Sequence, residues 1–168
     1  MSDARIEHLI QCSDDTFWKL FFDAEFNRKL FYDELGFEAW KLVSLEDGES
    51  RIDRVVDVIP KMGDLPGPLK KLLEGGAGYR ETASFDKAAK RMKIVVEPNS
   101  LQGKLHITGL LYTQPSGDGK CRRVYESNVV AKIFGLGGMI ESRIQSDVKA
   151  SHEKAAEFTN RWVKEKGL

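Results

Sequence analysis

The sequence lacks an excess of charge of either sign and lacks any long apolar run. Its 168 residues contain 26 Lys and Arg against 26 Asp and Glu. A nucleic-acid partner calls for a clear excess of cations on one face, so the balance argues against DNA or RNA binding. No apolar run approaches the roughly 20 residues that cross a bilayer, and the first residues have no apolar signal core. We therefore expect the protein in the cytoplasm.

Cysteine and histidine are too sparse for a metal or disulfide framework. Cys12 and Cys121 have no neighbouring Cys or His at ligand spacing, so we expect two reduced thiols, no metal and no cofactor. His8, His106 and His152 lie in unrelated contexts without a Gly-x-Ser-x-Gly motif. We interpret them as structural or surface residues and assign no catalytic residue.

Apolar periodicity predicts a strand, two short helices, six more strands and one long helix. The Asp47-Gly48 pair between two alternating runs indicates a hairpin. Residues 62–78, called the lid segment below, combine glycine and proline with leucines and predict a long connection with a helical turn or two. The strands are expected at about 5–12, 37–45, 49–59, 79–85, 91–96, 105–113 and 122–134, and the helices near 17–21, 24–35 and 139–163.

The last helix is the only element long enough to cover an antiparallel sheet with one buried face. At 1.5 Å per residue it would be about 36 Å long. We therefore predict a single α+β domain over residues 1–168. A curved antiparallel sheet of about seven strands wraps around the long C-terminal helix, and the two short helices follow the first strand.

This order resembles the helix-grip fold of the START-like, or SRPBCC, superfamily. The segments VEPNSLQG (96–103), ITG (107–109) and FGLGGMIE (134–141) are similar to a bacterial family within it, the domain of unknown function 2505 family. The similarity covers essentially the whole chain. A weaker likeness to VASt sterol-transfer domains rests on Arg54, Pro66-Gly67-Pro68 and the aromatic-rich first helices. The resemblance implies a cavity that binds a hydrophobic, lipid-like ligand such as a sterol or an acyl chain.

The candidate ligand site combines inward strand positions, the lid segment and the long helix. More than half of the aromatic residues lie between Phe17 and Trp40, too many for two short helices to bury between themselves, although core packing explains any single one. Arg54 and Glu81 share inward faces and would pair with each other or with a ligand, unless a one-residue register shift places them in water. The expected ligand-binding residues are Trp40, Arg54, Val56, Val58, Leu69, Leu73, Tyr79, Glu81, Ile94, Ile107, Tyr112, Ile140, Ile144 and Val148.

Three other features each allow a functional and a structural interpretation. Exposed leucines of the lid segment beside Lys70 and Lys71 suit transient contact with an anionic membrane surface, but a solvated loop with a local apolar cluster explains them equally. Glu141 suits the N-terminal end of the helix dipole. Residues 135–138 lack the Lys-Ser/Thr of a phosphate loop, which favours a tight turn.

Three functions remain open: binding and intermembrane transfer of a hydrophobic ligand, a cyclase or aromatase type of enzyme with an inward His or Glu, and a protein-interaction module. A large apolar cavity favours the binder. Two or more convergent titratable groups favour the enzyme. A filled sheet with an outer apolar patch favours the interaction module. The oligomeric state is left undetermined.

Overall fold

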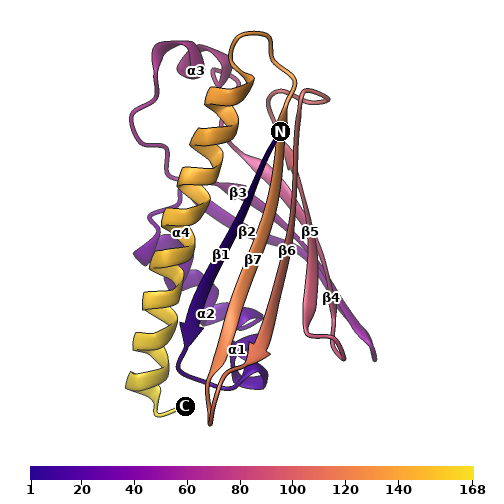
Figure 1. Cartoon of the computed structure of the whole chain (residues 1–168), viewed down its shortest axis with the longest axis vertical. Helices are drawn as coiled ribbons and strands as arrows, with labels where there is room; N and C mark the ends of the chain where they lie inside the picture. Colours follow the sequence, from indigo (N-terminus) through magenta and orange to yellow (C-terminus); the bar gives the residue numbers. More distant parts are fainter.

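A computed structural model describes all 168 residues and shows one seven-stranded antiparallel sheet with a long helix lying along it (Figure 1). The strand order is β1-β7-β6-β5-β4-β3-β2, so the chain runs as a meander from β2 to β7. The strands are β1 (Ser2–Ile10), β2 (Ala39–Asp47), β3 (Arg51–Ile59), β4 (Tyr79–Asp86), β5 (Arg91–Pro98), β6 (Leu105–Pro115) and β7 (Cys121–Ala131).

The first strand pairs with the last, which joins the two ends of the sequence in one sheet. Ser2 lies opposite Val129 and Ile10 opposite Cys121. β1 begins three residues before its expected start, because the backbone groups of residues 2–4 pair with β7. The β2–β3 hairpin closes at Gly48, whose N–H donates to the Arg51 carbonyl over 2.9 Å.

The short helices follow the predicted order, with one break in regular geometry. The Ser13 hydroxyl accepts from the Thr16 N–H at the start of α1 (Asp14–Phe21), and the Asp23 carboxylate accepts from the Phe26 N–H at the start of α2 (Ala24–Arg28). The expected helix 24–35 widens into a π-helical stretch, η1 (Lys29–Glu34). A further short helix, α3 (Gly67–Leu72), lies within the lid segment.

The helix α4 (Gly137–Lys166) runs along β1 and β7 (Figure 1). Its last turns pack on α2, where Phe26 lies 5.1 Å from Phe158 and 5.4 Å from Trp162 between ring centroids. At the start of α4, the structure supports the interpretation of residues 135–138 as a tight turn, since a Cβ on Gly137 would lie 2.5 Å from the Ala131 carbonyl oxygen. None of the helices is both long and apolar enough to cross a membrane.

The core consists of two apolar clusters at opposite ends of α4. The larger one, of 21 buried residues, joins α1, α2 and the last turns of α4 to the sheet. The smaller one contains Leu69, Leu105, Val129 and Ile140 and lies at the lid end. The architecture confirms the predicted α+β arrangement of a curved antiparallel sheet around a long C-terminal helix.

Candidate functional site

A cavity of about 360 Å³ lies between α4 and the inner face of the sheet. Of the 40 residues that line it, 25 are hydrophobic, so its wall is mainly apolar. The sheet contributes alternate residues of its strands, because only every second side chain of a strand faces inward. Residues of α1, α2 and η1 line one end and the lid segment lines the other.

The leucines of the lid segment point into the cavity. Leu65, Leu69, Leu72 and Leu73 all line it, and Leu69 is only 3% exposed. The sequence predicted Leu69 and Leu73 in the ligand site, and both line the cavity. The other suggestion, of exposed leucines beside Lys70 and Lys71, was wrong: the helical turn of α3 turns the leucines inward and leaves the lysines in solvent. The lid is therefore an apolar cover.

Arg54 and Glu81 form an ion pair inside this apolar wall. The Arg54 Nη2 group donates to Glu81 Oε1 over 3.2 Å, and Arg54 is 4% exposed. Its guanidinium carbon lies 4.6 Å from the Phe21 ring centroid, and the buried Nε and Nη1 groups have no hydrogen-bond partner. Burial lowers the pKa of Arg54, which the charge of Glu81 partly offsets. Arg54 on β3 and Glu81 on β4 therefore both face inward, as the predicted register requires.

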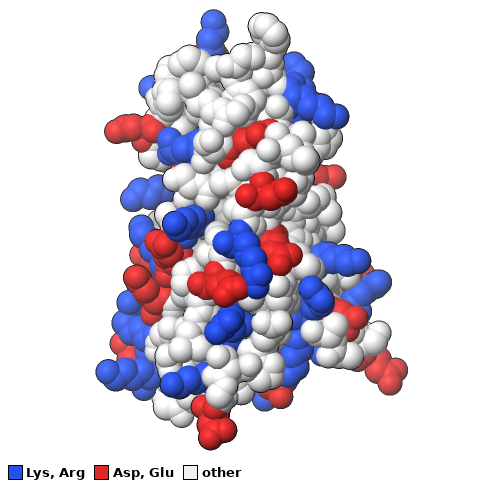
Figure 2. Space-filling model, in the orientation of Figure 1, with Lys and Arg blue, Asp and Glu red and all other residues white.

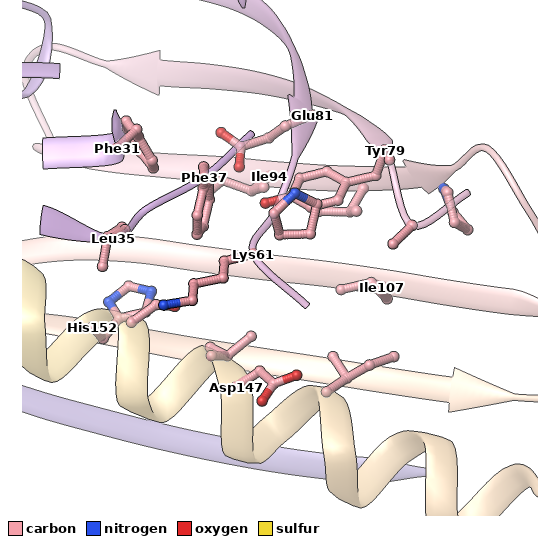
Figure 3. A pocket seen from close by; sticks show the side chains of 18 of the residues that line it. Phe31, Leu35, Phe37, Lys61, Tyr79, Glu81, Ile94, Ile107, Asp147 and His152 are labelled. Carbon is pink, nitrogen blue, oxygen red and sulfur yellow. The ribbon is translucent and has the colours of Figure 1, made fainter. Parts of the chain in front are cut away.

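Two phenols line the cavity near Glu81. Burial, and after it the charge of Glu81, raises the pKa of both Tyr79 and Tyr125, so both are neutral donors and acceptors. Tyr125 extends over Gly109, where a Cβ would lie 2.5 Å from its hydroxyl oxygen. Gly109 thus leaves the space that the tyrosine ring occupies. Figure 3 shows Tyr79 and Glu81 on the sheet side of the cavity.

A second polar group lies where β7 faces α4. The buried Arg123 donates through Nη2 to the His152 carbonyl over 2.8 Å and lies 3.2 Å from His8 Nδ1. The His152 ring stacks on Tyr125 with 4.3 Å between centroids. Burial and the charge of Arg123 lower the pKa of His152 well below its ordinary value, so the imidazole is neutral. Burial lowers the pKa of Arg123 to about 10.

The structure brings most of the predicted ligand-binding residues together on the cavity wall. Those that line it are Arg54, Leu69, Leu73, Tyr79, Glu81, Ile94, Ile107, Ile140, Ile144 and Val148. Their contact with a ligand stays a prediction. Trp40, Val56, Val58 and Tyr112 do not line the cavity.

The four exceptions have different physical reasons. Tyr112 lies on the outer face, since its neighbour Leu111 faces inward, and its hydroxyl donates to Glu126. Trp40 lies on the edge strand and stacks on Phe31 at 5.0 Å instead of reaching the interior space. Val56 and Val58 do face inward, but neighbouring side chains bury them to 1% and 3% exposure and leave no free volume beside them.

Sequence reasoning missed Arg123, Tyr125 and His152. A signal was present for each: Cys121, Arg123, Tyr125, Ser127 and Val129 alternate along one inward face of β7. His152 continues the four-residue spacing of Ile140, Ile144 and Val148 on α4. From the sequence we interpreted His152 as an ordinary structural or surface histidine, but in the structure it lines the cavity.

Glu141 lies beside this wall but does not line the cavity. Its carboxylate accepts from the Ala131 N–H over 3.0 Å and from the α-amino group of Met1 over 2.9 Å. These bonds lower its pKa, with the α-amino group as the first cause. The role seen is to join the start of α4 to the ends of β7 and β1.

A curved antiparallel sheet that grips a long C-terminal helix over a cavity defines a START-like, helix-grip protein. Within that class, the chain belongs to the family described as protein of unknown function (DUF2505), whose model matches residues 5–163. No curated protein matches the chain.

Solved structures of several proteins share the fold. The protein TTHA0849 of Thermus thermophilus has 18% identity and a TM-score of 0.66, with 99% of this chain and 100% of that chain covered. The Zhui aromatase/cyclase of a Streptomyces species has 13% identity, a TM-score of 0.66 and 96% coverage of both chains. Norcoclaurine synthase of Thalictrum flavum, in complex with dopamine and hydroxybenzaldehyde, has 16% identity and a TM-score of 0.67, covering 98% of this chain and 87% of that chain. At these identities the likeness shows the fold alone.

Proposed function

We propose that residues 1–168 act as one domain in the cytoplasm that binds a hydrophobic, lipid-like ligand in the cavity and transfers it between membranes. The observation that carries the proposal is a mainly apolar cavity of about 360 Å³ under an apolar lid. That volume lies within the range of small-molecule sites. Each 100 Å² of apolar ligand surface removed from water would contribute about 2.5 kcal/mol.

The similar solved structures support binding of a small molecule within this fold. Norcoclaurine synthase is seen with dopamine and hydroxybenzaldehyde, and Zhui is an aromatase/cyclase. Neither of these observations concerns a lipid. The lipid-like character of the ligand rests instead on the apolar wall and on the leucines of the lid segment.

Transfer is supported by the surface at the lid end of the molecule. Phe134, in the loop before α4, is fully exposed, and Met139 is 45% exposed. The lid segment and the loops 99–104 and 132–136 together contain four lysines and two acids. Lys70 and Lys71 are both in solvent. In Figure 2 the upper end is mostly uncharged with basic groups at its margin, while charges of both signs intermingle lower down. Such a surface suits brief contact with an anionic bilayer.

The test is native mass spectrometry of the purified protein followed by extraction and identification of the bound compound. We expect a complex with one hydrophobic molecule that organic solvent releases intact. Incubation of the emptied protein with a panel of lipids, followed by gel filtration, should restore a one-to-one complex. Failure of the emptied protein to retain any hydrophobic compound would refute binding.

An enzyme of the cyclase or aromatase type is the second candidate, because several titratable groups converge on the same cavity. Tyr79, Glu81, Tyr125 and His152 all line it. A neutral imidazole and a carboxylate are suitable acid–base groups. The two functions differ in the fate of the ligand: a carrier returns the compound unchanged, whereas an enzyme converts it during incubation. The interaction-module alternative requires a filled sheet, and this sheet encloses a cavity instead.

A further inference from the structure

The charges on the cavity wall do not balance. Arg54 is paired with Glu81 at 3.2 Å, and Arg143 is paired with Asp147 at 3.0 Å. Arg123 also lines the cavity, yet no acidic side chain lies within 4.0 Å of its guanidinium. The wall therefore holds a buried positive charge without a counter-charge.

The groups that Arg123 does contact are neutral. They are the backbone carbonyl of His152 and the Nδ1 atom of His8, and burial and then the charge of Arg123 lower the pKa of His8. The thiol of Cys121, two residues away on the same face of β7, is also neutral, since burial raises its pKa to about 12. Arg123 is 5% exposed, so water compensates little of its charge. A buried guanidinium in such surroundings is costly, and an acidic partner would remove most of the cost.

The cavity has a polar part around Arg123 and an apolar part at the lid end. Arg123 lies on β7 beside Tyr125 and His152, whereas the lid end is lined by leucines and isoleucines of the lid segment, β6 and α4. Lys61, which makes no ion pair either, extends into the cavity between these parts, and its side chain and that of His152 point toward one another in Figure 3. An elongated molecule with one acidic end would match this division.

We infer that Arg123 binds the carboxylate of an amphiphilic ligand whose apolar body extends toward the lid segment. The inference rests on the proposed binding function and names the class of its ligand. A ligand group with a single negative charge suits the site, because the guanidinium of Arg123 lacks one counter-charge. Charge-assisted hydrogen bonds from a guanidinium to a carboxylate are among the strongest polar contacts in proteins, and desolvation of the site strengthens them further.

The test compares three probes of equal chain length by titration calorimetry near neutral pH: decanoic acid, decanol and decylamine. We expect the acid to bind about tenfold or more tightly than the alcohol, as a hydrogen-bonded charge pair implies, and the amine to bind most weakly. In Arg123→Met the acid and the alcohol should bind within about twofold of each other. Arg122→Met, one residue away on the outer face of β7, removes an equal charge and should keep the tenfold preference.

The outcomes separate this inference from the function on which it rests. If the emptied protein retains neither these probes nor any lipid of the panel, the proposed binding function fails. If it retains a lipid of the panel but binds none of the three probes, binding stands and the inferred ligand class is refuted. If decanol binds as tightly as decanoic acid to the unaltered protein, binding stands and the role of Arg123 is refuted. The same holds if a folded Arg123→Met variant, shown by its melting curve to be intact, keeps the preference for the acid.

Discussion

At the scale of single residues, the ion pair of Arg54 and Glu81 is buried and should therefore be sensitive to substitution. Both side chains lie in the cavity wall, and two N–H groups of Arg54 already lack an acceptor. The pair joins β3 to β4 on their inner faces. On the outer face of the same two strands, Asp57 and Arg80 form a pair in solvent, with 2.7 Å between Nε and Oδ1.

Glu81→Gln should lower the free energy of unfolding by about 2 kcal/mol, because it leaves the buried guanidinium without a counter-charge. Asp57→Asn removes a charge of the same kind from the solvent-exposed pair and should cost less than about 1 kcal/mol. Urea denaturation of the two variants measures both values. Equal losses would mean that the inner pair is effectively solvated.

His152 should make stability depend on pH. Burial, and after it the charge of Arg123, holds its pKa in the folded protein below the ordinary value. As the pH falls through about 6.5, the unfolded chain gains a proton that the folded protein does not, so the free energy of unfolding decreases. Between about pH 7.5 and pH 5.5 the unaltered protein should lose about 1 kcal/mol more than His152→Phe, measured by urea denaturation. A loss of equal size in both proteins would contradict the assignment.

At the scale of elements, α4 has both a structural and a site-forming face. Its last turns contribute Phe158 and Trp162 to the larger cluster, while its first half lines the cavity with Ile140, Ile144 and Val148. The sequence predicted this helix from the spacing of its apolar residues. Its C-terminal end at Lys166, three residues beyond the expected end, is marked by Gly167 in the left-handed conformation.

Ile144→Trp should fill part of the cavity and weaken uptake of a fluorescent lipid at least tenfold without unfolding the protein. The added ring enters existing free space, so strain should be smaller than in a filled core. Lys149→Trp places the same side chain on the solvent face of α4 and should leave uptake unchanged. Fluorescence titration and a melting curve check both variants. A folded Ile144→Trp protein with full uptake would place the ligand elsewhere.

At the scale of the whole molecule, the lid segment that covers the cavity and the exposed Phe134 lie at the same end. The lid segment, the β5–β6 loop and the β7–α4 loop gather there (Figure 1). The closed lid hides its leucines, so contact with a bilayer would begin through Phe134 and the lysines. In the proposed transfer, movement of the lid segment away from the cavity would release the ligand.

In a liposome-to-liposome assay, Lys70→Glu with Lys71→Glu should slow transfer from anionic donors about fivefold or more at low salt. The effect should fade as salt rises and be nearly absent with neutral donors. Phe134→Ser should slow transfer from both kinds of donor, because it removes apolar contact instead of charge. Ligand affinity in solution should stay the same in both variants.

Lys120→Glu with Lys154→Glu is the matched control, since it changes net charge equally at exposed positions away from the lid segment. It should transfer at the rate of the unaltered protein. If the control slows transfer as much as the lid variant, the effect reflects net charge alone. If neither variant slows transfer, the lid end is not the docking surface.

The sequence by itself determined the elements and the faces of most of them. Periods of two and of about four residues, with the Asp47-Gly48 turn between two of the strands, specify strands and helices through local geometry. They also predicted that Arg54 and Glu81 each share a face with apolar neighbours, because side-chain alternation along a strand is a local property, but left open whether that face points inward. The order of the elements carried the inference to the helix-grip fold, and segments such as residues 96–103 carried the resemblance to the DUF2505 family.

Only the tertiary structure decided which inward residues meet free space. Val56 and Arg54 share one face of β3, but only Arg54 lines the cavity, since packing from other elements closes the space at Val56. Tyr112 shows how one residue of register reverses a side chain. The sequence also did not reveal that Arg123 lacks an acidic partner. That depends on distances among β1, β7 and α4, which no local sequence pattern specifies.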